Sequence, residues 1–548
     1  MFNLKSIYFY FLALQITLIK SIKKIYFSTN YYNKSLISKT PQQFFFHPNP
    51  FLLSSITNYK KFSFKISEFD PNIFWIKQKS IKAEKELNSF LWLNLIDRKN
   101  DGKKIQKIIN VWMLKHSKYK NNIWDSSVLS KRIISWILNV DIILNNGSFD
   151  FKKKFFDSII SQTNHIKKNI KFEKNYLKKI EILTALSLSG LVFKEHIANY
   201  NIGIKELEKL VKNYFDDSGF PLTRNPSDLI FISKYLLLCK ECIKDAHQYL
   251  PDFLDTIIEK NLSCIKNIIT PNKNIPLFNG GYEEDLKQFN NFINELNYKF
   301  KDKKNLVGGI YKFNIKNSSI FMDAGDPPAK NFSSSYQSGP LSFEYYLDGD
   351  KIITNCGFGA NISNKAEFLS RLTSAQSTLT INDTSVTQFE RNKIINNVFG
   401  NSIKNTFKIS GADFIENTDY AKFTATHNGY EKNFGCIHKR EISIDKKNWN
   451  LKGCDNLIKN KDGRPLIYNI RFHLYPGLTA IKTMSGNSVL IQISKNKSLI
   501  FTIKNESLSL EKSIFLGANK ILENTCVTVS GNLVNRDKTI YWEINKNI

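Results

Sequence analysis

The hydrophobic pattern of this chain changes its period near Asn305, and that change limits the folds open to it. Before this point, apolar residues recur every three or four positions, which is typical of helices with one buried face. After it come short alternating runs separated by Gly, Asn and Asp, which are typical of β-strands. More than ten such runs without intervening helices favour an antiparallel sandwich. The pattern therefore predicts an α+β multidomain protein, with a helical half followed by a β-sandwich half.

The helical half contains eight periodic stretches joined by short polar connections. Because short connections bring consecutive helices side by side, neighbouring helices should be antiparallel. Paired helices of this kind form an array or a closed α/α barrel. The predicted helices cover residues 81–96, 103–117, 128–144, 151–170, 177–193, 204–215, 229–247 and 253–269. The predicted strands include residues 341–347, 405–409, 468–474 and 539–544.

A chain of 548 residues is too long for one hydrophobic core, so two or three domains are expected. We expect a separate N-terminal segment at residues 1–22 and the helical domain at residues 78–304. The β-sandwich domain should cover residues 305–548. Residues 23–77 are aromatic, contain proline and lack a clear period, so we expect them to wrap around the helical domain.

The first twenty residues have the pattern of a targeting or membrane-associating segment. Lys5 precedes an apolar run at residues 6–19, and Lys20 ends it. This run is too short to span a membrane but fits the apolar part of a signal peptide. No small-residue cleavage site follows, so a membrane-surface or packed amphipathic segment is the alternative. We therefore predict a location in the cell envelope or periplasm, with a cytoplasmic or inner-membrane-associated location as the alternative.

The chain is strongly basic, with 78 Lys and Arg against 49 Asp and Glu and a formal net charge of +29. Such a surface attracts anionic polymers or anionic lipids. Nucleic acid is an unfavoured partner, because only nine of the basic residues are arginine, the residue that forks onto phosphates and guanines. Zinc-finger, RNP-type and P-loop segments are also missing from the sequence. Acidic polysaccharide and anionic lipid both remain open as partners.

Four short motifs follow the change of period in a fixed order. They are Asp323-Ala324-Gly325, Leu341-Ser342-Phe343-Glu344, Asn355-Cys356-Gly357 and the segment 371–379, which begins with Arg371 and ends in Ser-Thr-Leu. In this order they resemble the heparinase II/III-like proteins, particularly a bacterial branch of unknown substrate. The resemblance implies an (α/α) toroid or incomplete barrel joined to an antiparallel β-sandwich, with a substrate cleft between the two.

The resemblance also implies a lyase that cleaves acidic, glycosaminoglycan-like polysaccharides by β-elimination. A base removes the proton beside a uronate carboxylate, and the glycosidic oxygen on the next carbon leaves with the help of an acid. The site must neutralise the carboxylate, and Tyr or His serves as base and acid. A tyrosine base needs its usual pKa of about 10 lowered by nearby positive charge.

The sequence departs from the family where two histidines are expected. Their positions fall on Gln337 and Gln376, and a position that is acidic in zinc-bearing members falls near Asn355. Since glutamine is a poor zinc ligand, we predict no zinc and no other cofactor. The two amides can instead hydrogen-bond across the same gap.

Nine residues form the predicted site, and each also has a structural interpretation as a packing or turn residue. The candidate catalytic residues are Tyr311, Tyr336, Gln337 and His473. The candidate substrate-binding residues are Arg224, Asn225, Asn279, Asn355 and Gln376.

Arg224 is the candidate clamp for a uronate, because its loop should face the sandwich. On this hypothesis, Arg224→Ala and Tyr311→Phe should abolish activity and leave thermal stability nearly intact.

Two functions of different classes fit these residues. The first is a polysaccharide lyase acting on a uronate-containing polymer. The alternative is a catalytically inactive glycan-binding protein that handles cell-envelope polysaccharide, which the two missing histidines favour.

Overall fold

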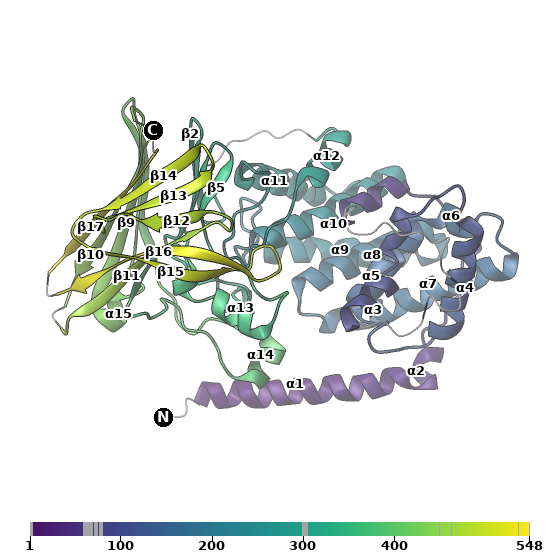
Figure 1. Cartoon of the computed structure of the whole chain (residues 1–548). Coiled ribbons are helices and arrows are strands. Elements are labelled where there is room, and N and C mark those ends of the chain that lie inside the picture. Colours follow the sequence, from purple (N-terminus) through teal and green to yellow (C-terminus); the bar gives the residue numbers. More distant parts are fainter. Residues whose placement is uncertain are drawn as a thin grey trace. The chain divides into compact units, whose positions relative to one another are not determined.

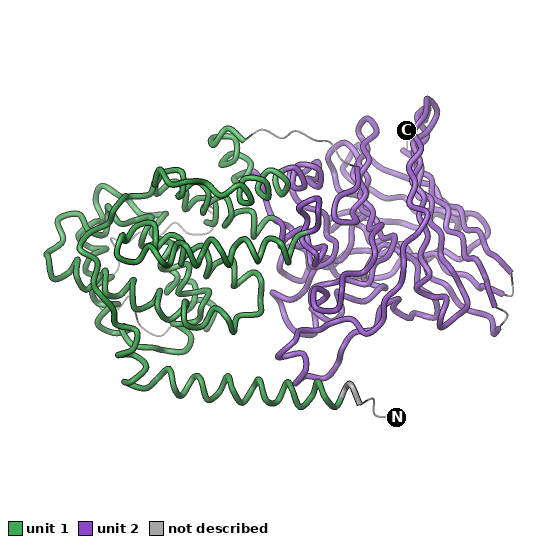
Figure 2. Tube along the Cα trace, turned by 180° about the vertical axis from the view of Figure 1, so that it is seen from behind, with its two compact units in different colours: residues 1–215, 230–262, 288–299 green, residues 216–229, 263–287, 300–548 purple. Residues whose placement is uncertain are grey.

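The computed structural model describes residues 4–57, 70, 75, 80–298, 305–448, 450–461, 463–534 and 536–546. The chain divides into two compact units (Figure 2). Unit 1 comprises Met1–Phe215, Ile230–Leu262 and Gln288–Lys299, and unit 2 comprises Asp216–Leu229, Ser263–Lys287 and Phe300–Ile548. Two short segments that precede residue 300 therefore belong to the same unit as the strands.

The described residues between 80 and 298 are mainly helical, as the periodicity predicts, and helices also precede them (Figure 1). The helices are α1 (Leu4–Ser28), α2 (Asn30–Lys34), η1 (Pro50–Ser55), α3 (Ile81–Asn88), η3 (Leu91–Leu95), α4 (Gly102–His116), α5 (Ser126–Leu138), α6 (Val140–Leu144), α7 (Phe149–Asn169), η4 (Ile170–Phe172), α8 (Tyr176–Val192), η5 (Lys194–His196), α9 (Ile197–Tyr214), α10 (Pro226–Asp245), α11 (Asp252–Ile268) and α12 (Lys287–Glu295). Among the described residues, none of these helices is long and apolar enough to cross a membrane.

Two of the expected helices are interrupted, each for a local reason. The stretch at 81–96 breaks at Phe90, whose backbone is left-handed with φ 59°. The stretch at 128–144 breaks at Asn139, whose amide donates to the Ser135 carbonyl and accepts from Arg98. Periodicity alone does not show such breaks, because the apolar spacing continues across them.

Close packing of α8 on α9 depends on two glycines. A Cβ at Gly190 would lie 2.2 Å from the backbone nitrogen of Tyr200, and one at Gly203 would lie 2.3 Å from the Ser187 hydroxyl. Contacts this short are not seen between real atoms, so any side chain here would push the helices apart. Residues 180–192 of α8 are buried, and this helix forms the centre of unit 1.

Unit 2 is built on two antiparallel sheets (Figure 1). One runs in the order β1 (Leu306–Val307), β2 (Ile310–Ile315), β3 (Ser318–Asp323), β4 (Phe343–Leu347), β5 (Asp350–Thr354), β11 (Leu466–Leu474), β16 (Leu522–Leu533) and β15 (Ser507–Phe515), with β6 (Leu379–Ile381) also paired to β11. The other runs in the order β12 (Thr479–Lys482), β13 (Ser488–Ser494), β14 (Lys497–Ile503), β17 (Lys538–Lys546), β10 (Leu451–Lys459), β9 (Cys436–Asp445), β8 (Tyr420–His427) and β7 (Ile409–Glu416).

The described parts of the chain confirm the predicted fold class, a helical half followed by an antiparallel β-sandwich. The short helices of unit 2 are η6 (Lys330–Phe332), α13 (Asn364–Ser370), η7 (Thr373–Ala375), α14 (Lys393–Phe399) and α15 (Glu431–Phe434). They lie in the connections between strands.

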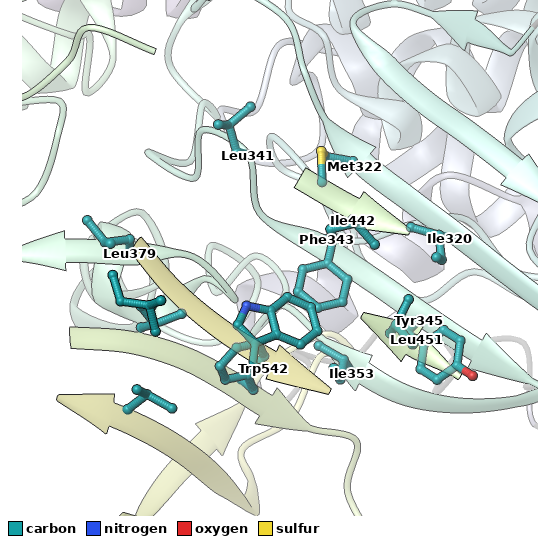
Figure 3. Close-up of a cluster of buried hydrophobic side chains, with 14 of the residues drawn as sticks. Ile320, Met322, Leu341, Phe343, Tyr345, Ile353, Leu379, Ile442, Leu451 and Trp542 are labelled. Carbon is teal, nitrogen blue, oxygen red and sulfur yellow. The ribbon is translucent and has the colours of Figure 1, made fainter. Parts of the chain in front are cut away.

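The sandwich core is aromatic and aliphatic (Figure 3). Phe343 stacks on Trp542 with ring centroids 5.6 Å apart, and Phe472 meets the same indole edge-on at 4.8 Å. Gly453 on β10 faces this indole, and a Cβ at Gly453 would come within 2.0 Å of it. Burying rings of this size supplies much of the stabilisation of such a core.

One expected strand, at residues 405–409, is wrong. β7 begins only at Ile409, and the segment before it is irregular. The Asn405 side chain holds this loop, because its oxygen accepts from the Gln388 nitrogen at 2.6 Å and its amide donates to the Val386 carbonyl at 2.9 Å. Side-chain bonds of Asn to nearby backbone compete with strand pairing.

Candidate functional site

Arg224 lies in the turn before α10 and clamps two loops of unit 2. Its guanidinium donates to the carbonyls of Gly308, Gly325 and Asp326, each at 3.0 Å, and to the carboxylate of Asp323. The Asp323 side chain is 2% exposed, so this is a buried ion pair. Burial raises the pKa of Asp323, and the positive charge of Arg224 offsets part of that rise. The fork of Arg224 is therefore occupied by the protein's own oxygens.

The glycines around Arg224 leave room for its side chain. A Cβ at Gly309 would lie 2.4 Å from a guanidinium nitrogen, and one at Gly325 would lie 2.5 Å from it. Gly325 belongs to the Asp323-Ala324-Gly325 motif, and contacts with Arg224 explain both the acid and the glycine of this motif. The acid pairs with Arg224, and the glycine lets the guanidinium approach the backbone.

Asn225 and Asn279 are both tied into the same region. Asn225 precedes Pro226 at the start of α10, and its side-chain oxygen accepts from the Ser227 nitrogen at 2.9 Å, as a helix N-cap does. Asn279 has a left-handed backbone with φ 53°, and its amide donates to Asp323 at 3.4 Å. The Asn279 side-chain oxygen is buried and finds no hydrogen-bond partner among the described residues.

Gln337 and Gln376 meet at one backbone carbonyl. Both side-chain amides donate to the carbonyl of Ser370, at 2.8 and 2.7 Å. Both also lie 3.9 to 4.0 Å from the Cys356 sulfur. The Gln337 oxygen accepts from the Gly280 nitrogen at 3.0 Å, so this amide links the 279–281 turn to the sandwich loops.

The amide nitrogens of this pair are directed at carbonyl oxygens. A zinc ion would need lone pairs at these positions, which an amide nitrogen does not offer. The residues present therefore do not fit the structural zinc that the family resemblance implies for some members. Among the described residues, no group of three His, Cys, Asp or Glu side chains is arranged to hold a metal ion.

Asn355 and His473 are connected through Ser377. The Asn355 side chain accepts from the Ser377 nitrogen at 2.9 Å, and the Ser377 hydroxyl accepts from the His473 nitrogen at 3.0 Å. The His473 ring contacts the Ser374 carbonyl through Nε2 at 3.1 Å and the Ser513 hydroxyl through Nδ1 at 2.9 Å. Since a carbonyl only accepts, Nε2 carries the proton. Burial lowers the pKa of His473 to about 4, so the ring is neutral at neutral pH.

The two candidate tyrosines are buried in different surroundings. Tyr311 lies in the core between the sheets and stacks on Phe423 with centroids 4.2 Å apart. Tyr336 is fully buried, and its hydroxyl has no hydrogen-bond partner among the described residues. Burial raises the pKa of both, and the charge of Asp323 raises that of Tyr336 further. A general base needs a shift in the opposite direction.

Four of the predicted site residues therefore lie in one buried polar network of unit 2. Its members are Arg224, Asn279, Gln337 and Gln376, joined through Asp323, Gly280 and Ser370. Asn355 and His473 are joined separately through Ser377, and Asn225 bonds to Ser227 and Asp228. Tyr336 adjoins the network through its electrostatic interactions with Asp323 and Arg224. Tyr311 belongs to the hydrophobic core instead.

A second buried network fixes two of the sequence motifs from the opposite sheet. Arg440 on β9 pairs with Asp455 on β10 at 2.7 Å and also donates to the carbonyls of Leu341 and Ser377. Burial alone would raise the pKa of Asp455, but Arg440 and His438 hold it below its usual range. These bonds position the Leu341-Ser342-Phe343-Glu344 motif and the segment 371–379 against the second sheet.

His427 and His438 extend this network as a chain of neutral rings. The Gly429 nitrogen donates to Nδ1 of His427, so Nε2 of His427 carries the proton and donates to Nδ1 of His438 at 3.1 Å. Nε2 of His438 then donates to Asp455 at 2.7 Å. Burial lowers the pKa of both rings. They are buried core histidines with every ring nitrogen occupied.

An open pocket of about 530 Å³ lies beside the motif segment 371–379, and our sequence analysis did not predict it. Arg391 and Lys404 line it with the rings of Phe368 and Phe389. The Arg391 guanidinium lies 5.6 Å from the Phe368 ring and has no ion-pair partner among the described residues. The only sequence signal was that Arg391 is one of nine arginines in a lysine-rich chain.

The pocket also offers hydroxyl groups. Ser374 from the motif segment lines it, as do Ser385 and Thr387. The Thr387 hydroxyl is fully buried and finds no hydrogen-bond partner among the described residues. Asp383 also lines the pocket, but its carboxylate is paired with Arg471 at 2.9 Å. The cations, aromatic rings and hydroxyls are suited to a small anionic, hydroxyl-rich group.

Comparison with known proteins agrees with the fold. Residues 300–543 match the sequence family described as "Heparinase II/III-like, C-terminal". The heparan sulfate lyase HepC of Pedobacter heparinus has a similar structure, with 15% sequence identity, a TM-score of 0.65 and coverage of 94% of this chain and 87% of that one. A structure of heparinase III gives 15% identity, a TM-score of 0.65 and coverage of 89% and 80%.

A curated relative is the FtsZ-localized protein C of Caulobacter vibrioides. It is 26% identical over 216 residues, which are 37% of this chain. The match spans 36% of that relative's length.

Proposed function

Because residues 300–543 form a heparinase II/III-like C-terminal domain, we propose that the chain is a polysaccharide lyase-like protein acting on a uronate-containing polysaccharide. The observation that carries this proposal is the shared fold, which extends over about nine-tenths of this chain and includes its helical part. The net charge of +29 supports an acidic polymer by electrostatic attraction. The proposed reaction is β-elimination.

We assign the contact with the polymer's acidic groups to the Arg391 pocket. Arg391 is exposed and its guanidinium is free of carboxylate partners in the described structure, so it can fork onto a carboxylate or sulfate. Lys404 adds a second positive charge, although Glu390 lies 3.5 Å from it. The buried network around Arg224 then serves to hold the loops that shape unit 2.

The alternative function is glycan binding without turnover. Two observations favour it: burial raises the pKa of Tyr311 and Tyr336, and both ring nitrogens of His473 are engaged. Such a protein would bind the acidic polymer in the pocket but would lack a general base for β-elimination.

An ultraviolet absorbance assay separates the two functions. β-Elimination leaves a conjugated unsaturated sugar that absorbs, whereas binding leaves the polymer unchanged. The purified chain is mixed with heparan sulfate and with a panel of other uronate-containing polysaccharides. A rise in absorbance with any of them establishes the lyase. Binding to one polymer without a rise in absorbance establishes glycan binding. If no acidic polymer gives a rise or binds, both proposals are contradicted.

The assignment of the pocket has a test of its own. Arg391→Gln should weaken binding of the acidic polymer by about tenfold, the loss expected when one charged hydrogen-bond pair is removed. Arg464→Gln removes an exposed arginine from the turn before β11 and is the matched control. Equal affinities for both variants would exclude the pocket as the contact site and leave the fold-based proposal standing.

The cell-envelope location is a further proposal. Fractionation of cells that produce the full chain tests it, because an envelope protein sediments with membranes or leaves the cell with the periplasmic contents. Recovery of all the protein in the soluble cytoplasmic fraction would contradict it.

A further inference from the structure

Helix α1 carries a row of solvent-exposed apolar side chains along one side. Tyr8, Phe11, Leu18, Ile22 and Ile25 are each between 57% and 72% exposed. Their spacing of three, four and seven residues places all five on one side of a helix. Single exposed apolar side chains are ordinary, but a row of five along one helix marks an interaction surface.

The opposite side of α1 is attached to unit 1 near its C-terminal end. Phe27 packs against Tyr32 at 4.6 Å and against His165 at 5.2 Å between ring centroids. The Lys23 ammonium lies over the Phe172 ring. These contacts fix which side of the helix faces unit 1 and which side remains exposed.

The charges of this region are all positive. The first 67 residues contain nine lysines and no Asp or Glu, and the first acidic residue is Glu68. Within α1, Lys20 and Lys24 are exposed on the side of the helix away from this apolar face. An apolar face on a helix whose polar side carries only positive charge is the pattern of helices that lie in a membrane interface rich in anionic lipid.

We propose that α1 binds the surface of an anionic membrane through this face, lying in the interface rather than crossing it. With 25 residues α1 is long enough for a span, but it is not apolar enough. A second copy of the helix is a poorer occupant of the face. Two copies would bring together two segments whose only charges are positive, without any acidic residue to pair with. Anionic headgroups supply the missing counter-charge.

Vesicle co-sedimentation of the full chain tests this proposal. The vesicles are phosphatidylcholine alone and a 3:1 mixture of phosphatidylcholine with phosphatidylglycerol. We expect binding to the mixed vesicles that weakens as salt is raised, because salt screens the lysines. The double variant Leu18→Glu, Ile22→Glu should bind at least about tenfold more weakly, since it loses the burial of two large apolar side chains.

Ile481→Glu in β12 is the matched control. Ile481 is 65% exposed, so the substitution makes the same chemical change at a site outside α1. This variant should bind like the unchanged protein. Equal losses in control and double variant would overturn the proposal, as would no binding of the unchanged protein to the mixed vesicles.

Two further measurements separate the lipid surface from the other occupants. Lys20→Gln with Lys24→Gln should reduce binding to the anionic vesicles, and an unchanged affinity would contradict the role of charge. Sedimentation velocity without lipid should give the same mass for the unchanged protein and the double variant. A dimer that dissociates in the double variant would mean that a second copy covers the face, and it would overturn the proposal.

Discussion

Replacing Arg224 by alanine should destabilise unit 2 strongly, which differs from the near-unchanged stability expected from the sequence. The substitution removes four hydrogen bonds and leaves the buried carboxylate of Asp323 without its cation. Removing one partner of a buried ion pair costs about 3–5 kcal/mol, because the remaining charge stays desolvated. That is a large part of the stability of an ordinary domain.

The expected shift in melting temperature follows from the size of the unit. The three segments of unit 2 hold 288 residues. At an unfolding entropy of about 2 cal/mol/K per residue, 1 kcal/mol lowers the melting temperature of such a unit by about 1.6 °C. The loss should therefore be about 5–8 °C, measured by differential scanning calorimetry with Arg464→Ala as the exposed control.

The destabilisation should also depend on pH. Without Arg224, burial is opposed only by the Gly325 backbone amide and the Asn279 side chain, so the pKa of Asp323 in the folded state should rise above that in the unchanged protein. A carboxyl with a raised folded pKa destabilises the folded state as pH rises through the interval between its unfolded and folded pKa. The difference in free energy of unfolding between Arg224→Ala and the unchanged protein should thus be largest near pH 8 and become smaller toward pH 5.

A second substitution tests the reasoning directly. In the double variant Arg224→Ala, Asp323→Asn the buried carboxylate is gone, so part of the lost stability should return, and the pH dependence of the difference should vanish. If Arg224→Ala unfolds within 1 kcal/mol of the unchanged protein, or if Asp323→Asn adds its own full loss to that of Arg224→Ala, the buried-pair reasoning is refuted.

Three other perturbations have defined outcomes. The unchanged protein should lose up to about 3 kcal/mol of stability between pH 6.5 and 4, because folded His473 has a pKa of about 4 and binds fewer protons than the unfolded ring. His473→Gln should remove this part of the loss. Urea unfolding at both pH values measures it, with exposed His247→Asn as the control. Lys351→Met leaves Glu344 without the buried cation 2.9 Å away and should lower the free energy of unfolding by about 3–5 kcal/mol in urea titration, whereas a loss below 1 kcal/mol would contradict this. Dialysis against EDTA should leave the melting temperature within about 1 °C, since the described residues hold no cluster of three metal-ligating side chains, and a large drop would reveal a metal.

The sequence predicted the layers of this protein well because its hydrophobic period is strong. The stretch expected at 177–193 is α8, Tyr176–Val192, and that expected at 468–474 lies within β11, Leu466–Leu474. α8 is buried on all sides from residue 180 and β11 over most of its length, so each is present in the sequence as a predominantly apolar run. Breaks such as Asn139 depend on a side-chain bond to the local backbone and were missed.

The site was harder to predict because sequence shows residue types but not burial. Arg224 was a reasonable uronate clamp, yet its partners Gly308 and Gly325 lie 84 and 101 residues away in sequence and occupy the guanidinium. Tyr311 carries a polar hydroxyl, but the register of β2 places its ring against Phe423. The Arg391 pocket is assembled from loops without any period, so no pattern in the sequence indicated it.

The chemistry of β-elimination sets a condition on Tyr336 as a base. A tyrosine base must lose its proton near neutral pH, which requires excess positive charge at its hydroxyl. Tyr336 has Arg224 and Arg371 nearby, but burial and Asp323 outweigh them and raise its pKa. Since Arg224 is already paired with Asp323, its charge is largely cancelled as seen from Tyr336. A lyase that used Tyr336 would therefore have to separate this pair or protonate Asp323 when substrate binds, whereas a glycan-binding protein can keep the pair intact throughout.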